Sequence, residues 1–356
     1  MIAALSTQQS VFTGWRVLGL QVIGSQKIGV GPDLPALANS AKPVRLVVRI
    51  EGARGPLAVP ALWAELEPLL ARWRAGGVDV VGIEIDHDCA TAALDDYASW
   101  LRELRDAMPR DLKLSVTALP SWLESPALDQ VLGAVDDSVL QVHAVQRPDH
   151  ALFDAASARA WTLAYAARTS HPFAVALPAY SVRVDTDATG RVRAVDAEAD
   201  IERSGPSGRE LHADPREVAA YLREMIDEAP RRLAGFVWFR LPVQGDRRGW
   251  SKTTLAALIK DDALAADFVT EWLVQKGGAT DIWVRNAGNL GDVPPVLLLP
   301  VHCRIADALA GYRLELAVSG LQLRPDFDIR VQPGERVRAG WMRCSGAADD
   351  NVQPSP

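Results

Sequence analysis

The sequence predicts an α/β fold: a TIM-type (β/α)₈ barrel that lacks its first strand, followed by a small antiparallel β-sandwich. Short apolar runs alternate with helical patterns over residues 1–262. Most of these runs are almost continuously apolar, as strands of a buried parallel sheet are. After about residue 263 the pattern changes to short alternating runs between turn residues. A chain of 356 residues that is 48% hydrophobic can form a barrel of about 250 residues and one further domain.

Seven runs have the composition of barrel strands, and helical stretches lie between them. The strands are expected at 16–23, 43–51, 79–88, 112–119, 138–145, 172–180 and 233–241. The helices are expected at 60–75, 94–107, 126–133, 154–169, 214–229 and 251–259. Pro60 and Pro215 suit the first turn of their helices. Repeated βα units imply right-handed crossovers and a parallel sheet or barrel.

Seven strands are one fewer than a closed barrel requires. The first ten residues resemble the end of a helix that leads into strand 16–23. We therefore expect the first strand to be missing, through truncation or a misassigned start, with an open or rearranged sheet as the alternative. Strands 16–23 and 233–241 would then be exposed edges, which promote aggregation.

Residues 182–213 form a long insertion after the sixth visible strand. A hairpin is expected around Asp187 and Gly190. The insertion would lie at the C-terminal rim, where barrel active sites are built, or it could be a solvated loop.

The second domain is expected over residues 263–345. Its strands are expected at 267–275, 280–286, 294–301, 312–318 and 336–343. The polar residues 346–356 are predicted to form a disordered tail.

Composition limits the classes of partner. The net charge is −7 with both signs mixed, and without a basic stripe nucleic acid is not an expected partner. No stretch approaches the roughly 20 apolar residues of a membrane span, and the N-terminus lacks the features of a signal peptide. The 11 tryptophans could fill the core, or some could stack on sugars.

The three cysteines, Cys89, Cys303 and Cys344, do not have the spacing of a metal site. Cys303 and Cys344 lie in the same predicted domain and could pair, which would leave Cys89 alone. Three free buried thiols are an equal alternative. We expect no metal and no cofactor.

The segment GIEIDHD at 82–88 points most directly to chemistry. Glu84, Asp86 and Asp88 would share one face of a strand, because alternate side chains point the same way. Like charges raise one another's pKa values, so such a site can hold both a proton donor and an anion. His87 would lie on the other face, packed against a helix. A divalent cation on the acids is a weaker alternative, because no further carboxylate follows at loop spacing.

Several of these segments resemble strand motifs of family-eighteen chitinases. The segment GIEIDHD resembles their fourth-strand DGxDxDxE, and LPAYSVR at 177–183 resembles their seventh-strand GxPxYGxR. The segments LSVTALP at 114–120 and GFVW at 235–238 resemble the fifth and eighth strands. Over almost its whole length, from GIEIDHDCAT to GWMRC, the chain is similar to an uncharacterised bacterial family, the domain of unknown function 3142.

This resemblance implies a chitinase-like barrel without an established reaction. It places Asp88 at the catalytic acid, where Asp replaces a longer Glu, and a displacement of that order can cost about 100-fold in rate. Asp86 matches the residue that positions the substrate, and Glu84 replaces another Asp. The Tyr of the sixth-strand motif is absent, and His143 is the nearest polar residue. An exported, periplasmic or cell-envelope location is also implied, which would suit a bridge between Cys303 and Cys344.

Further candidates lie near the strand ends. Tyr180 and Trp238 could define a sugar subsite or belong to the core. His143 could shuttle protons near neutral pH or be a satisfied interior residue. Gln146 could bind sugar hydroxyls. Arg240, like Arg183, could bind an anionic sugar group, although pairing with Glu84 and Asp86 is favoured because unpaired buried acids are costly.

The leading hypothesis is a glycoside hydrolase-like protein that hydrolyses a polysaccharide or other glycan. Asp88 would be the general acid, assisted by Asp86 and Glu84. Residues two apart on a strand are separated by about 6.6–6.8 Å along it, which does not decide between retention and inversion. The rival hypothesis is a carbohydrate-binding or scaffold barrel without turnover.

Overall fold

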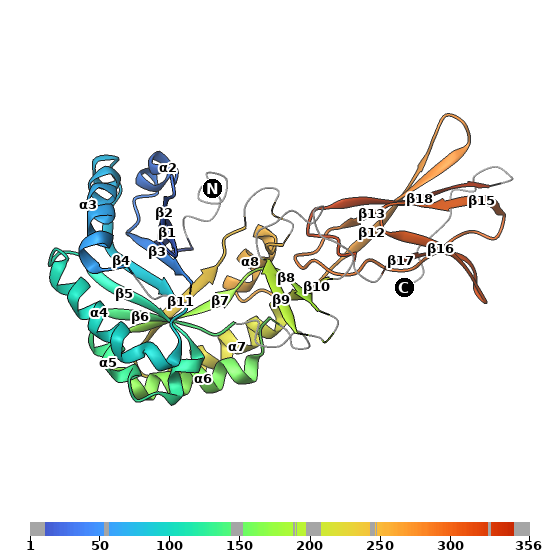
Figure 1. Ribbon diagram of the computed structural model, residues 1–356. Helices are drawn as coiled ribbons and strands as arrows, with labels where there is room; N and C mark the ends of the chain where they lie inside the picture. The colour runs from blue at the N-terminus through green and yellow to red at the C-terminus, as the bar shows by residue number, and fades with distance from the viewer. Residues whose placement is uncertain are drawn as a thin grey trace. The chain divides into compact units, whose positions relative to one another are not determined.

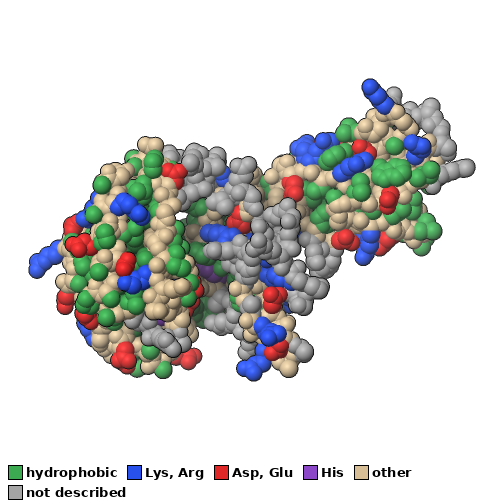
Figure 2. All heavy atoms as spheres, turned by 45° about the horizontal axis from the view of Figure 1, so that its top comes forward, with side chains coloured by type: hydrophobic (Ala, Val, Ile, Leu, Met, Phe, Trp, Pro, Cys, Tyr) green, Lys and Arg blue, Asp and Glu red, His purple; other side chains and the backbone are tan. Residues whose placement is uncertain are grey.

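The computed structural model describes residues 11–52, 57–143, 152–187, 189, 191–196, 208–242, 246, 248–326 and 329–344 (Figure 1). The chain divides into two compact units, Met1–Gly249 and Trp250–Pro356. In the described part, no helix is both long enough and apolar enough to cross a membrane. Lys and Arg side chains are interspersed with Asp and Glu on the face shown in Figure 2.

The first unit is built on an eight-stranded sheet of order β11-β7-β6-β5-β4-β3-β1-β2. Its strands are β1 (Trp15–Ile23), β2 (Gln26–Gly29), β3 (Val44–Glu51), β4 (Val80–His87), β5 (Lys113–Ala118), β6 (Asp137–Gln141), β7 (Phe173–Pro178) and β11 (Leu233–Phe239). Every neighbouring pair is parallel except β1 with β2. The seven parallel strands are those that the apolar runs predict.

Helices follow the strands and cover the outer side of the curved sheet (Figure 1). They are α2 (Leu34–Asn39), α3 (Val59–Ala75), α4 (Leu94–Ala107), α5 (Leu128–Gly133), α6 (Ala155–Arg168) and α7 (Pro215–Glu228). Asp214 caps α7 by accepting a hydrogen bond from the Arg216 N–H, which satisfies one of the free amides of the first turn. The short elements α2, η1 (Thr91–Ala93) and η2 (Pro120–Glu124) were not predicted, because they are too short to show a period. The unit is therefore an α/β structure with a parallel sheet.

The two ends of this sheet differ. β2 pairs antiparallel with β1, from Leu20 opposite Gly29 to Ile23 opposite Gln26. The expectation of an exposed edge at strand 16–23 is therefore wrong, because the polar segment QKIG forms a covering strand. β11 pairs with β7, and within the described residues no pairing joins β11 to β1. The (β/α)₈-type barrel that lacks its first strand stays a prediction.

The insertion forms a second sheet, of order β10-β8-β9. Its strands are β8 (Ser181–Thr186), β9 (Val192–Asp196) and β10 (Gly208–His212). β8 and β9 pair antiparallel across the predicted turn, so the hairpin is confirmed. Just before β8, Tyr180 pairs with Gly249 in an isolated bridge.

The second unit contains α8 (Lys252–Ile259) and two antiparallel sheets, of order β12-β13-β18-β15 and β14-β17-β16. The strands are β12 (Phe268–Val274), β13 (Ala279–Asn286), β14 (Leu297–Leu298), β15 (Cys303–Ala308), β16 (Tyr312–Ala317), β17 (Gly320–Pro325) and β18 (Arg336–Cys344). Side chains of both sheets, among them Ile282, Leu323 and Met342, form one buried core. β15 and β17 were not predicted, and β14 is shorter than expected. Residues 346–356, the predicted tail, lie outside the described residues.

The cysteines of the two units differ in state. Cys303 on β15 lies directly opposite Cys344 on β18, and the two form a disulfide. Cys89 is a buried free thiol in the first unit.

Candidate functional site

Strand register places charged side chains on the inner face of the parallel sheet. Asp86 on β4 lies opposite Arg49 on β3, and Glu84 lies opposite Ser115 on β5. In a parallel sheet, residues in register point to the same side. On the other face, His87 is buried against the Tyr97 ring of α4, with 5.3 Å between ring centroids. The predicted division of the acidic segment between two faces is therefore confirmed.

Glu84 is the most deeply buried of the three acids, with 5% of its surface exposed. Its carboxylate pairs with the Arg16 guanidinium of β1 and accepts a hydrogen bond of 3.0 Å from the Thr117 hydroxyl of β5. A buried charge needs such partners, because water no longer solvates it. Glu84 therefore links β1, β4 and β5 and has no direct access to a ligand.

Asp86 and Asp88 share one arginine. The Arg49 Nη1 donates to an Asp86 oxygen at 2.8 Å, and the Arg49 Nη2 donates to an Asp88 oxygen at 2.7 Å. On its other side, the Arg49 Nε lies 3.7 Å from a Glu51 oxygen, and Glu51 accepts a hydrogen bond from Gln21. The rigid, planar guanidinium thus fixes both acids at the carboxyl end of β4.

The two acids that share Arg49 have different surroundings. The second oxygen of Asp86 is buried and has no hydrogen-bond partner in the described part of the chain. The side chain of Asp88 is 51% exposed. Burial raises the pKa of Asp86, the Arg49 charge opposes this rise, and the charge of Asp88 adds to it. Asp86 is thus the enclosed acid of the pair, and Asp88 is the one that a ligand can reach.

A further ion pair lies toward the amino ends of the same strands. Arg45 on β3 pairs with Asp137 on β6 at 2.5 Å, across two intervening strands. Burial, and then the nearby charge of Arg45, lower the pKa of Arg16 to about 10, while Asp137 acts in the opposite direction. The inner face therefore holds linked arginine–carboxylate pairs where barrel interiors usually hold branched apolar side chains.

Three rings gather at the carboxyl ends of β6, β7 and β11. The Tyr180 ring meets His143 and Phe239 edge to face, at 5.8 and 5.3 Å between centroids, and His143 stacks on Phe239 at 6.0 Å. Burial lowers the pKa of His143 to about 4, although its ring bonds the Ala176 carbonyl. A histidine that is neutral near pH 7 is a poor proton shuttle there. This observation favours the satisfied interior residue of the two alternatives.

Tyr180 connects these rings with the acids. Burial raises its pKa to about 12, and the charges of Arg240 and then Arg49 oppose the rise. The Arg49 charge therefore acts on Tyr180 as well as on Asp86 and Asp88. The Arg240 guanidinium lies over the Tyr180 ring, with its carbon 5.9 Å from the ring centroid. The aromatic residues and the acids thus belong to one region of the inner face.

The sequence left open whether Trp238 lies at a sugar subsite or in the core, and the strand register bears on this choice. Trp238 pairs with Leu177 and Phe239 with Pro178, so the two aromatics point to opposite faces. Phe239 is the one that packs against Tyr180 and His143, and 45% of its surface is exposed. The sequence GFVWF is apolar on both faces and carries no alternation that could separate them.

The two arginine candidates, Arg240 and Arg183, pair with acids outside the segment 82–88. Arg240 forms a forked pair with Asp246, through Nε at 3.0 Å and Nη2 at 2.9 Å, and Arg183 pairs with Asp185 at 3.1 Å. The partners found on Glu84 and Asp86 are instead Arg16 and Arg49. Gln146 lies outside the described residues.

Sequence reasoning missed Arg16, Arg49, Thr117 and Phe239. A signal for Arg49 was present in β3, whose sequence VRLVVRIE places Arg45 and Arg49 on one face of an otherwise apolar strand. Charged residues in a buried strand require partners, and the acids of the next strand were the available ones.

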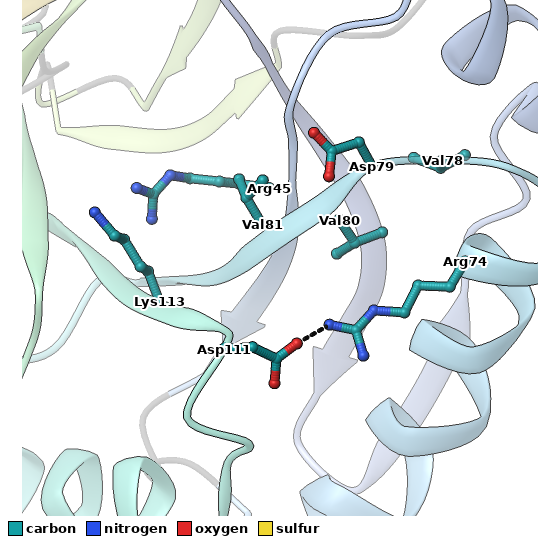
Figure 3. Close-up of a pocket in the computed structure, with 8 residues that line it drawn as sticks. All are labelled: Arg45, Arg74, Val78, Asp79, Val80, Val81, Asp111 and Lys113. Carbon is teal, nitrogen blue, oxygen red and sulfur yellow. Dashed lines mark hydrogen bonds and ion pairs between the residues drawn. The ribbon is translucent and has the colours of Figure 1, made fainter.

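A surface pocket of about 620 Å³ lies at the other end of these strands (Figure 3). Its lining includes Arg45, Lys113 and the ion pair of Arg74 with Asp111 at 2.7 Å. Arg45 and Lys113 lie at the amino ends of β3 and β5, Asp111 precedes β5, and Arg74 lies in the last turn of α3. Asp86 and Asp88 lie instead at the carboxyl end of β4. Because parallel α/β sheets bind their ligands outside the carboxyl ends of the strands, we locate the candidate site at Asp86 and Asp88.

Comparisons with known proteins show a family and several structures of similar fold. A family described as Domain of unknown function (DUF3142) matches residues 40–244, more than half of the chain. A second, Domain of unknown function (DUF8456), matches residues 270–345. No curated protein matches the chain.

The similar solved structures have low sequence identity. The spore cortex-lytic enzyme SleL of Bacillus cereus has a TM-score of 0.49 at 12% identity, covering 74% of this chain and 71% of that one. The glycoside hydrolase family 18 chitinase ChiB of Flavobacterium johnsoniae has a TM-score of 0.46 at 12% identity, covering 73% and 89%. A family 18 N-acetylglucosaminidase of Paenibacillus barengoltzii has a TM-score of 0.44 at 12% identity, covering 73% and 95%.

Proposed function

The chain belongs to the DUF3142 family, and we propose that it is a glycoside hydrolase-like protein that acts on a glycan at Asp86 and Asp88. One observation carries this proposal: a single guanidinium, that of Arg49, holds two carboxylates in different surroundings. One carboxylate is buried with a raised pKa, and the other is half exposed. Hydrolysis of a glycosidic bond uses two neighbouring carboxyl groups with different surroundings.

Each acid has a separate role in this proposal. Asp88 donates a proton to the leaving glycosidic oxygen, because its carboxylate is the one that substrate can reach. Asp86 supports it through Arg49, the group that both acids share. Glu84 assists as a positioning residue, since its pair with Arg16 fixes the strand that carries the other two.

The neighbouring rings would form the sugar subsite. The exposed ring of Phe239 offers a flat apolar surface of the kind that sugar rings stack on, and buried Tyr180 packs against that ring edge to face. We also propose an exported or cell-envelope location, because the disulfide of Cys303 with Cys344 persists in oxidising compartments.

A carbohydrate-binding barrel without turnover is the second candidate. It is favoured by the pairing of every acid in the segment with an arginine, Glu84 with Arg16 and the other two with Arg49. A guanidinium stabilises the ionised carboxylate, which opposes proton donation.

The first prediction separates the two candidates. We expect the wild-type chain to hydrolyse at least one member of a panel of soluble glycans, and Asp88→Asn to reduce kcat by about 100-fold or more, the lower range for removing a general acid. The measurement is reducing-end release, with glycan binding followed in parallel by calorimetry.

The matched control is Asp79→Asn, which removes an exposed acid at the other end of the same strand. It should leave turnover unchanged. Equal turnover in wild type and Asp88→Asn would remove Asp88 from the mechanism. Binding without turnover in both would establish the non-catalytic candidate, and neither binding nor turnover would contradict both.

A further inference from the structure

Strand β16 lies at an edge of its sheet and carries exposed apolar side chains. In the order β14-β17-β16 it pairs with β17 on one side, and in the described part of the chain no strand pairs with its other side. Along one face of the strand, exposure rises from buried Tyr312 to Leu314 at 36% and Leu316 at 84%, and Val318 in the next turn is fully exposed. Edge strands are usually protected against pairing by charged side chains, prolines or bulges. The register of β16 with β17 runs without a bulge, so this edge is open to a further strand.

The backbone groups of β16 alternate between β17 and the open edge. The Gly311 carbonyl accepts a hydrogen bond of 2.7 Å from the Asp326 N–H, in register with the ladder of β16 and β17. Odd-numbered residues of the strand therefore bond to β17, and even-numbered ones point the other way. The N–H and C=O groups of Leu314 and Leu316 thus face outward, where an added antiparallel strand would bond to them.

The side chains of β16 are complementary to a second copy of the same strand. If two copies pair antiparallel about Leu314, Arg313 of each lies opposite Glu315 of the other, and Tyr312 lies opposite Leu316. Directly opposed charges of unlike sign are favourable, and those of like sign are unfavourable. A pairing centred on Arg313 or on Glu315 would oppose like charges, and a shift by one residue would set charged side chains against apolar ones. The sequence of β16 therefore favours one self-pairing register.

The charged side chains of β16 are accessible for such a pairing. The Arg313 side chain is 59% exposed and contacts Glu315 of its own strand through Nε at 2.7 Å. A guanidinium has further N–H donors, which leaves donors for a partner's carboxylate. The outer strand of the other sheet, β12, differs, because its only charged residue, Glu271, finds no opposite charge in a second copy.

We propose that two copies of this chain associate through β16, as an antiparallel pair centred on Leu314. The Leu314 N–H of each copy donates to the Leu314 carbonyl of the other, and the two sheets of order β14-β17-β16 join into one. Both copies contribute the same residues about a two-fold axis, so the interface closes at a dimer. Leu314 and Leu316 form an apolar stripe with the partner's Tyr312 on one face, and the Arg313–Glu315 pairs lie on the other.

The test is sedimentation velocity of the full chain over a concentration series, in non-reducing buffer. We expect a reversible equilibrium of monomer and dimer. Arg313→Glu and Glu315→Arg should each raise the dimer dissociation constant by about tenfold or more, because two opposite-charge pairs become like-charge pairs. An equimolar mixture of these two variants should form a heterodimer, since every Arg of one chain then lies opposite a Glu of the other. Circular dichroism of each variant checks the fold.

A proline substitution tests the backbone bonds separately. Leu316→Pro removes an outward N–H and leaves the ladder with β17 in place, since proline is tolerated where the N–H faces away from the sheet. It should weaken the dimer by about tenfold or more. The matched control is Val274→Pro on β12, where the side chain is 69% exposed and the N–H also faces outward, because that of Gln275 donates to Ala279. This control should leave the dissociation constant unchanged.

Hydrogen exchange gives a readout that does not depend on variants. Amides of β16 should become more protected as the protein concentration rises, whereas those of β12 should not. A chain that stays monomeric at every concentration overturns the proposal, whatever other strand this edge accepts. A dimer that withstands both Arg313→Glu and Leu316→Pro also overturns it, because its interface then lies elsewhere. If Glu315→Arg does not fold, since it also loses Arg324, the other two variants still decide.

Discussion

Glu84 and Asp86 are two residues apart on β4, yet their surroundings give them different chemistry. Glu84 pairs with Arg16 and Thr117 inside the sheet, so its charge is used to hold strands together. Asp86 has one oxygen on Arg49 and the other buried without a partner in the described chain. Three acids at regular spacing are therefore not three equivalent catalytic groups.

His143 provides a residue-scale prediction about pH. Burial lowers its pKa from 6.5 to about 4, so below pH 6.5 the unfolded chain binds a proton that the folded chain does not. The free energy of unfolding is therefore unaffected by His143 above pH 6.5 and decreases as the pH falls from 6.5 to 4. The shift corresponds to about 3 kcal/mol.

We expect His143→Asn to remove this loss. Asparagine does not titrate, and its amide can still donate to the Ala176 carbonyl that His143 contacts. Urea denaturation of both chains at pH 7 and pH 4 measures the effect. Between pH 7 and pH 4, the free energy of unfolding should fall by about 3 kcal/mol less in His143→Asn than in the wild-type chain. An identical acid dependence would contradict the assignment.

At the scale of elements, the cross-sheet pair of Arg45 on β3 with Asp137 on β6 is expected to stabilise the parallel sheet. Both side chains are mostly buried. We predict that Asp137→Asn lowers the free energy of unfolding by about 3–5 kcal/mol, because it leaves Arg45 buried without its counter-ion. The measurement is chemical denaturation at neutral pH.

The paired replacement Arg45→Met with Asp137→Leu is the control. Removing both charges avoids an isolated buried ion, so the double variant should be far more stable than Asp137→Asn. A double variant as unstable as the single one would mean that the pair contributes through its shape and not its charge.

The sequence predicted the strands and helices better than it predicted which side chains form ion pairs and ring contacts between them. The parallel strands were recognisable because each is a compact apolar run. β2 was missed because it has only four residues, all exposed, and Ile28 is its single large apolar one. The acidic segment was assigned to the correct face because it alternates cleanly. Phe239 was missed because its strand is apolar on both faces. Arg16 could not be matched to Glu84 from the sequence, since the order of the strands decides which charges meet.

At the scale of the whole molecule, the oxidation state of the chain should control the stability of its second unit. The disulfide closes a loop of 41 residues, and the chain-entropy relation gives such a loop about 4 kcal/mol. We expect reduction of the disulfide to lower amide protection in β15 and β18. Hydrogen exchange with mass spectrometry measures this, and the double variant Cys303→Ser with Cys344→Ser should reproduce it in oxidising buffer. Unchanged exchange on reduction would contradict the prediction.

The arginine–carboxylate pairs inside the parallel sheet also bear on how this protein responds to heat. Charged groups lose favourable hydration as temperature rises, so the cost of keeping them away from water falls. The desolvation free energy of burying the Arg16, Arg45 and Glu84 side chains is therefore smaller at high temperature than at low temperature. Polar surface also reduces the heat-capacity change of unfolding, which flattens the stability curve. A sheet held by such pairs is therefore expected to lose stability more slowly on heating than one filled with hydrocarbon alone.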